Sequence, residues 1–209
     1  QNRSAKKVYE TPQVRYAVAA ATAFHMEKTD RLKYVKEYYT HASNGHFSLA
    51  TPVLAGLGTP TKQFSSCVLI STNDSLKSIF ATGEMMADYA ANRAGLGLEI
   101  GRIRGIGAAV KKGLIEHTGI VPFLKYWFAS MRSCSQGGIR NASCTVTIPI
   151  WHYQFDDFIV LKNNQGTDEN RVRFMDYCVA VNAYFWNRFK NKENITFFDP
   201  NEVPEKYEA

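Results

Sequence analysis

Apolar residues recur at helical spacing in the first part of the chain, between residues 11 and 43. A first set follows the i, i+3, i+4, i+7 pattern at Val14, Ala17, Val18 and Ala21. A second amphipathic set follows at Leu32, Val35 and Tyr39. The spacing predicts two packed helices, and the Pro and Gly residues between positions 52 and 60 then predict a loop.

Strand and helix patterns alternate in the rest of the chain. The β-favouring run at residues 67–70 predicts a first buried strand, and Ser75 is a candidate cap for a helix that Gly95 ends. Further strands are predicted at residues 96–103, 145–150 and 195–198, and further helices at residues 118–132, 153–162 and 172–190. This alternation predicts a parallel α/β sheet or part of a barrel, preceded by helices.

A glycine-rich basic segment follows the second predicted strand. Its glycines at positions 105, 107 and 113 predict a flexible loop and would let backbone N–H groups approach a phosphate. The segment lacks the third glycine of GxGxxG, and Gly113 follows Lys112 where a P-loop has Ser or Thr. The pattern alone therefore favours a plain connection, although its basic side chains (Arg102, Arg104, Lys111 and Lys112) also suit a triphosphate.

The composition indicates a folded chain with a buried core. Of 209 residues 45% are hydrophobic, and 25 Lys and Arg against 19 Asp and Glu give a net charge of +6, which favours anionic partners. The charges are scattered and no aromatic-basic motif accompanies them, so nucleic-acid binding is the weakest alternative. The longest apolar run, residues 17–24, is far shorter than the roughly 20 residues of a membrane span. The chain begins with Gln, which we interpret as processing, truncation or membership of a longer polypeptide.

The four cysteines are too widely spaced for a CxxC metal motif, and a chain of this size needs no disulfides, so a reducing cytosol is expected. The histidines are dispersed, and no metal site is predicted. Cys144, in a predicted strand, and Cys178, in a predicted helix, are expected to be small buried residues. Cys67 follows a polar run, so that its sulfur either faces a cleft or is buried, and the pattern leaves both readings open.

Seven strings carry a resemblance to a known family. They are LATP at residues 49–52, TPTKQFSSC at 59–67, NRAGLG at 92–97, GRIR at 101–104, HTG at 117–119, SCSQGGIR at 133–140 and VLKNN at 160–164. In this order and at these spacings they resemble the large, catalytic subunit of class I ribonucleotide reductase, of the kind found in enterobacteria and their large phages. The resemblance covers nearly the whole chain, and TPTKQFSSC and SCSQGG are highly specific.

The resemblance implies an α/β fold and a reductase activity. Residues 63–209 would form the first part of the family's ten-stranded α/β barrel, and residues 1–62 the end of its N-terminal helical domain. The family reduces ribonucleoside diphosphates to deoxyribonucleoside diphosphates by thiyl-radical chemistry with a redox cysteine pair. Cys67 matches the cysteine of that pair that helps to reduce the 2′ position.

The resemblance also assigns binding residues. Positions that line the substrate site match Thr51, Ser66, Ala94, Gly95 and Arg140. Positions around the allosteric specificity site, where a deoxynucleoside triphosphate or ATP binds near the dimer interface, match Asp74, Ser75, Leu76, Arg104 and Val110. The loop that relays effector identity to the substrate base matches residues 134–143, with contacts at Cys134, Gln136 and Arg140. Residues 141–144, Asn-Ala-Ser-Cys, stand where glycines are frequent in the family, so this loop is expected to be stiffer.

Several catalytic and radical-transfer residues of the family have no counterpart in this sequence. The family's radical-bearing cysteine, second redox cysteine and radical-transfer tyrosines lie further along than Ala209. The chain is expected to bind no cofactor of its own, because the radical cofactor belongs to the small subunit. Expected partners are the carboxyl-terminal remainder of the large subunit, the radical-generating small subunit, thioredoxin or glutaredoxin, and a second copy in a homodimer. The alternative is a catalytically incomplete nucleotide-binding or interaction fragment.

Overall fold

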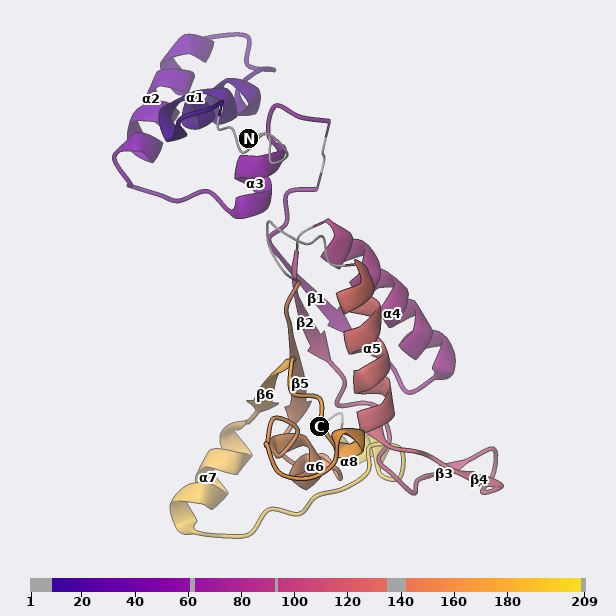
Figure 1. Cartoon of the computed structure of the whole chain (residues 1–209). Helices are drawn as coiled ribbons and strands as arrows, with labels where there is room; N and C mark the ends of the chain where they lie inside the picture. Colours follow the sequence, from indigo (N-terminus) through magenta and orange to yellow (C-terminus); the bar gives the residue numbers. More distant parts are fainter. Residues whose placement is uncertain (1–8, 61–62, 93, 135–141, 208–209) are drawn as a thin grey trace. The chain divides into compact units, whose positions relative to one another are not determined.

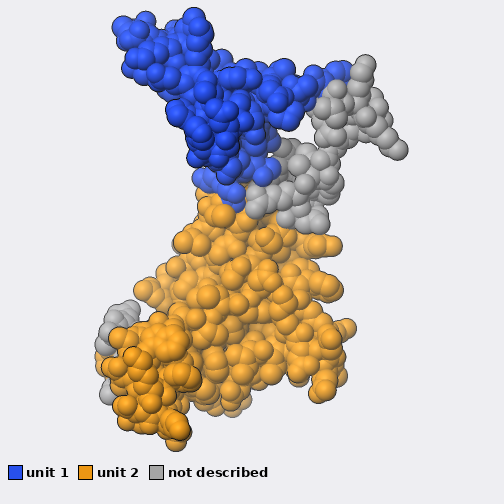
Figure 2. All heavy atoms as spheres, turned by 90° about the vertical axis from the view of Figure 1, so that its left-hand side faces the viewer, with its two compact units in different colours: residues 1–66 blue, residues 67–209 orange. Residues whose placement is uncertain are grey.

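The structure, a computed structural model, describes residues 9–60, 63–92, 94–134 and 142–207 (Figure 1). The chain divides into two compact units, residues 1–66 and residues 67–209, shown in blue and orange in Figure 2. Each unit is described by itself. The predicted domain boundary, between residues 62 and 63, lies close to this division and stays a prediction.

The first unit consists of helices α1 (Pro12–Ala23), α2 (Arg31–Ser43) and α3 (Thr51–Gly56) in its described part. The hydroxyl of Thr11 accepts a hydrogen bond from the N–H of Val14 at 3.4 Å, which caps the start of α1. Ala19 and Ala20 of α1 are fully buried, which lets α2 pack closely against α1. The two helices predicted from the apolar spacing are confirmed.

Helix α3 occupies part of the segment that the Pro and Gly residues predicted as a loop. The guanidinium of Arg15, on α1, donates to the carbonyl oxygens of Leu54 and Leu57 at the end of α3. Gly58 follows with φ +75°, and a Cβ there would lie 2.8 Å from Cγ1 of Val18. The glycine therefore ends a short helix that a tertiary contact stabilises, which the sequence pattern did not reveal.

The second unit contains a parallel sheet with strand order β1-β2-β5-β6. Its strands are β1 (Cys67–Ser71), β2 (Gly95–Glu99), β5 (Cys144–Pro149) and β6 (Asp176–Ala180). Helices α4 (Leu76–Ala91) and α5 (Ile120–Cys134) lie side by side against one face of the sheet (Figure 1). Strand–helix–strand alternation with a helical first part confirms the predicted fold class.

The core lies between this sheet and the helix pair. Along β2, Leu96 and Leu98 point into the core and are at most 5% exposed, while the alternate positions 95, 97 and 99 face the opposite side. Trp127 of α5 is fully buried, and its Nε1 donates to the carbonyl oxygen of Ile79 on α4 at 3.0 Å. The buried side chains of the strand and the apolar stripe of the helix therefore pack together in one core.

The opposite face of the sheet carries exposed side chains. Leu69 is 86% exposed, and Cys67, two residues earlier on β1, is also exposed. The strand register places Cys178 on the same face, because it pairs with Thr147, which pairs with Glu99. The described residues thus leave this face of the sheet open to solvent.

The sequence prediction for residues 172–190 was wrong. Instead of one helix, the segment forms β6 and then α7 (Ala183–Asn191), with the side chain of Asn182 accepting the N–H of Phe185 at 2.9 Å as a cap. Cys178 was predicted to be buried in that helix but is exposed on β6. Pairing with β5 is a tertiary interaction that outweighs the local helical pattern.

Smaller differences concern the connections. The predicted strand at residues 195–198 is reduced to one isolated parallel bridge between His152 and Phe198. The predicted helix at residues 153–162 shortens to α6 (Phe155–Ile159). A 3-10 helix, η1 (Asp168–Asn170), precedes β6, and a short helix, α8 (Pro204–Tyr207), follows α7. The predicted flexible loop contains an antiparallel hairpin, β3 (Ala109–Val110) and β4 (Ile115–Glu116). Among the described residues, no helix has the length and apolarity that a membrane crossing requires.

Candidate functional site

The sequence-predicted site residues of the second unit lie at opposite ends of the parallel sheet. Cys67 and Gly95 start β1 and β2, whereas Asp74 and Arg104 follow the ends of those strands. Cys67 and Ser71 are separated by roughly 13 Å along β1, at about 3.3 Å per residue. The redox candidate and the effector candidates therefore occupy two distinct places.

The amino end of the sheet brings three predicted residues together. Cys67 is exposed, so its thiol is open to solvent and not sealed in the core. It pairs in register with Gly95, whose neighbour Ala94 is 1% exposed and donates its N–H to the carbonyl oxygen of Tyr89 at 3.0 Å. A ligand beside Cys67 would therefore also lie beside the backbone of Gly95.

The other predicted substrate and relay residues are only partly described. Thr51 is the first residue of α3 and is exposed, but it belongs to the first unit. Ser66 directly precedes Cys67 in the sequence. Cys134 is exposed at the end of α5, while Gln136 and Arg140 lie outside the described residues. Their predicted roles stay predictions.

The carboxyl end of the sheet holds an ion pair between two predicted effector residues. Nη2 and Nε of Arg104 each lie 2.7 Å from Oδ2 of Asp74, and the N–H of Arg104 donates to Oδ1 at 3.3 Å. The two side chains are 19% and 20% exposed, so this ion pair is partly shielded from water. The turn after β1 and the turn after β2 are joined by these contacts.

Further predicted residues adjoin this pair. The Ser75 hydroxyl accepts the N–H of Ser78 at 3.2 Å and caps α4, of which Leu76 is the first residue. Nη1 of Arg104 donates to the carbonyl oxygen of Ala109 at 2.6 Å, which brings the β3–β4 hairpin and Val110 to the same place. The structure therefore brings together all five predicted effector residues.

This cluster combines cationic groups, which can bind an anion, with a carboxylate that can accept a hydrogen bond from a ligand hydroxyl. Lys111 and Lys112, both exposed, form the hairpin turn with φ of 50° and 60° and add two cations. The amino end of α4 adds the positive end of a 16-residue helix. The Asp74 carboxylate can accept a hydroxyl group, and the guanidinium of Arg104 can donate to phosphate oxygens.

Three buried polar side chains support the arginine-bearing turn, which we define as residues 101–106. His152 is fully buried, Gln154 is 3% exposed and Asp199 is 5% exposed. They bind the carbonyl oxygen of Ile103, the N–H of Ile106 and the N–H of Gly105, at 2.9, 3.1 and 2.5 Å. The sequence did not mark these three residues, because their partners are backbone groups 48 to 94 positions away.

We expect the second unit to lose stability as the pH falls from 7 to 5.5. The pKa of His152 is lowered, and burial is the largest cause. The hydrogen bond to Ile103 and the charge of Asp199 raise this pKa and only partly oppose the effect of burial. Because the unfolded chain then binds more protons than the folded one, the free energy of unfolding decreases below the unfolded pKa of about 6.5. Burial lowers the pKa of His117 in the same direction.

Urea unfolding at pH 7.0 and 5.5 measures this effect. The variant His152→Gln keeps a hydrogen-bonding group but cannot titrate, so its stability should change less between the two pH values. An equal pH dependence in both proteins would contradict the role of His152.

The described part of the second unit also contains a buried thiol and several pockets, one of which, of about 420 Å³, adjoins Gln154 and Ile106. Burial raises the pKa of Cys144 to about 12, with a further contribution from Asp176, so this thiol stays protonated, and its predicted burial is confirmed.

A pocket of about 190 Å³ adjoins the arginine-bearing turn, beside Tyr153 and Asp199. Another, of about 650 Å³, lies between α7 and residues 194–198, away from the predicted site residues. Within the described ranges, no group of three or more His, Cys, Asp or Glu could hold a metal ion.

Comparison with known proteins gives two family matches. Residues 65–209 match the family described as ribonucleotide reductase, barrel domain, and residues 1–62 match ribonucleotide reductase, all-alpha domain. The chain is 45% identical over 210 residues to ribonucleoside-diphosphate reductase subunit alpha of Buchnera aphidicola subsp. Baizongia pistaciae, and 44% identical over 210 residues to ribonucleoside-diphosphate reductase 1 subunit alpha of Escherichia coli K12. Both alignments cover 100% of this chain and 28% of the relative.

A viral relative matches equally well. Ribonucleoside-diphosphate reductase subunit alpha of Enterobacteria phage T4 is 43% identical over 202 residues, which is 97% of this chain and 27% of that protein. The chain thus spans little more than a quarter of the length of the curated relatives that it matches.

Proposed function

Because the chain belongs to the family of ribonucleotide reductase large subunits, we propose that it forms part of an enzyme that reduces ribonucleoside diphosphates. The thiol of Cys67 supplies one half of the reducing pair, and a second cysteine comes from the rest of the large subunit. When the pair forms a disulfide, it releases two electrons and two protons. The 2′ hydroxyl then leaves as water and a C–H bond replaces it.

The exposed thiol at the start of β1 is the observation that carries this proposal. Cys67 lies on the open face of the sheet, beside the backbone of Gly95, within the string TPTKQFSSC. A thiol there can reach a sugar and can exchange with an external reductant, whereas the buried Cys144 cannot. The proposed location is the cytoplasm, where thioredoxin or glutaredoxin regenerates the thiols.

Reconstitution tests the proposal. This chain is mixed with the remaining carboxyl-terminal part of the large subunit, the radical-generating small subunit, thioredoxin and its reductase. We expect deoxyribonucleoside diphosphate to form in the complete mixture and not when this chain is left out. Formation at the same rate without the chain would overturn the proposal.

The carboxyl end of the sheet is the proposed effector site. Asp74 would accept a ribose hydroxyl, and Arg104 would donate to the phosphates of a deoxynucleoside triphosphate or ATP. The amino end of α4, at Ser75 and Leu76, and the hairpin at Val110 would border the ligand. The site would lie near the interface of a homodimer, as the family resemblance implies.

We expect Arg104→Ala to raise the Kd for thymidine triphosphate about 10- to 100-fold, the effect of losing a charge-assisted hydrogen bond. The variant also leaves the carboxylate of Asp74 without its cation, so that it repels the phosphates. Equilibrium titration measures the change. Arg173→Ala is the matched control, because Arg173 forms its ion pair with Asp168 in a different segment. Unchanged affinity in Arg104→Ala would contradict the assignment.

The second candidate function is a nucleotide-binding module without turnover of its own. The effector cluster favours it, because all five residues lie within the described part of the second unit, where Arg104 binds both Asp74 and the carbonyl oxygen of Ala109, next to Val110. This function predicts thymidine triphosphate binding by the chain alone, with no gain in reduction when the other components are added.

A further inference from the structure

Gln154 connects two segments that are distant in the sequence. Its side-chain oxygen accepts the N–H of Ile106 at 3.1 Å and the N–H of Ile120 at 2.9 Å. Ile106 ends the arginine-bearing turn, two residues after Arg104, and Ile120 is the first residue of α5. One buried oxygen atom thus holds the proposed effector site and the start of a long helix.

The orientation of this side chain is fixed by its other contacts. Its Nε2 donates to Oδ2 of Asp157 at 3.1 Å, so the oxygen faces the two backbone N–H groups. Its own N–H donates to Nδ1 of His152, whose Nε2 therefore carries the proton and donates to the carbonyl oxygen of Ile103 at 2.9 Å. The turn is held at both Ile103 and Ile106 by this pair of side chains.

Gly119 packs directly against the Gln154 side chain. A Cβ at Gly119 would lie 2.6 Å from the Gln154 oxygen, and Gly119 has φ +83°. Only glycine fits between the side chain and the start of α5. A shift of the arginine-bearing turn must therefore either carry the Gln154 side chain and the start of α5 with it, or break the partly buried hydrogen bond from the N–H of Ile106.

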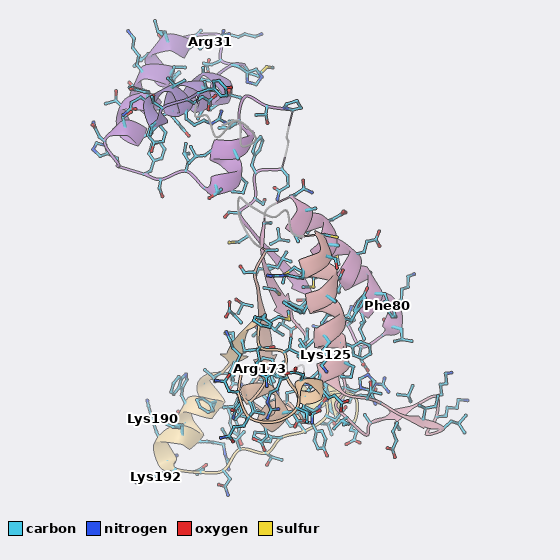
Figure 3. The ribbon with its side chains drawn as sticks, viewed as in Figure 1. Arg31, Phe80, Lys125, Arg173, Lys190 and Lys192 are labelled. Carbon is cyan, nitrogen blue, oxygen red and sulfur yellow. The ribbon has the colours of Figure 1, made fainter. Side chains whose placement is uncertain are left out.

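Helix α5 leads from this contact to the other end of the sheet. The helix, which carries Lys125, runs alongside the sheet (Figures 1 and 3). It starts at Ile120 and ends at Cys134, the first residue of the predicted relay loop. Leu124 and Trp127 are fully buried along it, and Met131 is 1% exposed. A helix packed at each turn moves as a rigid body, so displacement of its first residue is passed to its last.

We propose that Gln154 is a positioning residue that couples effector binding at Arg104 to α5, and through α5 to the relay loop. This rests on the proposed function, which supplies the effector and the loop. Gln154 is not among the residues proposed to bind substrate or effector. It acts by joining the arginine-bearing turn to the start of the helix.

The coupling is measured by amide hydrogen exchange in this chain combined with the rest of the large subunit. Thymidine triphosphate should slow exchange in the wild type both at residues 103–107 and in the first two turns of α5. In Gln154→Leu, which lacks both hydrogen-bonding groups, it should slow exchange at residues 103–107 only. Gln154→Asn, one methylene shorter and of the same polarity, should behave like Gln154→Leu and replaces it if the Leu variant does not fold.

Two variants serve as controls. Asp157→Ala removes only the acceptor of Nε2, so it should still transmit the effect to α5. The double variant Gln154→Glu with Asp157→Asn restores both an accepting oxygen at position 154 and a partner at position 157, and it should recover the wild-type response.

A functional readout separates coupling from general damage. In the reconstituted reductase, the ratio of turnover for two ribonucleoside diphosphates is compared between two effectors. We expect this effector-driven change of preference to fall about tenfold in Gln154→Asn, within the usual range of coupling between sites. A merely structural defect would lower turnover for both substrates alike and leave the ratio unchanged.

The outcomes distinguish this inference from the proposed function. Absence of thymidine triphosphate binding in the wild type would overturn the effector site and the inference with it. Binding in the wild type, with α5 protected equally in Gln154→Asn, would overturn the role of Gln154 alone and leave the proposed function in place.

Discussion

Cys67→Ser is expected to abolish deoxynucleotide formation in the reconstituted reductase, with turnover lowered on the order of 10⁴-fold or more, as for loss of an essential catalytic group. A serine hydroxyl matches the thiol in size and hydrogen bonding. It cannot form a disulfide, so the two electrons needed at the 2′ position are missing. The exposed position of Cys67 on β1 makes the variant well tolerated in the fold.

The matched control is Cys178→Ser. Cys178 is also exposed on the open face of the sheet. It lies on β6 and is aligned in register with Thr147 and Glu99, near the carboxyl ends of the strands, whereas Cys67 starts β1. Its loss should leave turnover within about twofold, a change of about 0.4 kcal/mol in the activation free energy. Product formation by Cys67→Ser at the wild-type rate would refute the assigned role, and circular dichroism of both variants checks that the fold is retained.

Trp127→Ala is expected to lower the free energy of unfolding of the second unit by about 3–5 kcal/mol. Trp127 is fully buried between α4, α5 and the sheet, so the change removes a large apolar side chain and leaves a cavity. It also removes the hydrogen bond from Nε1 to the carbonyl oxygen of Ile79, which stays buried without that donor.

Urea unfolding followed by tryptophan fluorescence measures this loss. The chain has three tryptophans, all in the second unit, so Trp151 and Trp186 still report on that unit in the variant. Trp186→Ala is the control, because its side chain on α7 is 48% exposed and its removal should cost less than about 1 kcal/mol. A loss below about 1 kcal/mol for Trp127→Ala would contradict the core described for the second unit.

The separation of the two sets of site residues has a consequence for regulation. Effector residues at the carboxyl end of the sheet and Cys67 at the amino end do not touch, so any influence of one on the other must pass through the elements between them. Helices α4 and α5 both run between these ends and pack tightly against each other, with the Ser130 hydroxyl donating to the Gly83 carbonyl oxygen at 2.9 Å. The hydrogen bonds of Gln154 connect the arginine-bearing turn to α5, one helix of this pair.

The sequence by itself determined the fold class and the place of each strong element. The apolar spacing of α1, α2, α4 and α5 and the β-favouring runs of β1 and β5 are local patterns whose period reflects which face is buried. The strings around Cys67 and Arg104 likewise pointed to the family, because they depend on residue type and order alone. These features need no knowledge of distant contacts.

Only the tertiary structure decided the remaining features. Residues 172–190 have a helical pattern, but pairing with β5 makes part of them a strand and exposes Cys178. The partners of Gln154 and Asp199 are backbone groups 48 and 94 residues away, which no local spacing encodes. Whether the Cys67 sulfur is buried depended on which face of the sheet the helices cover. In each case the deciding free energy comes from groups brought together by folding, and a sequence pattern describes only neighbours along the chain.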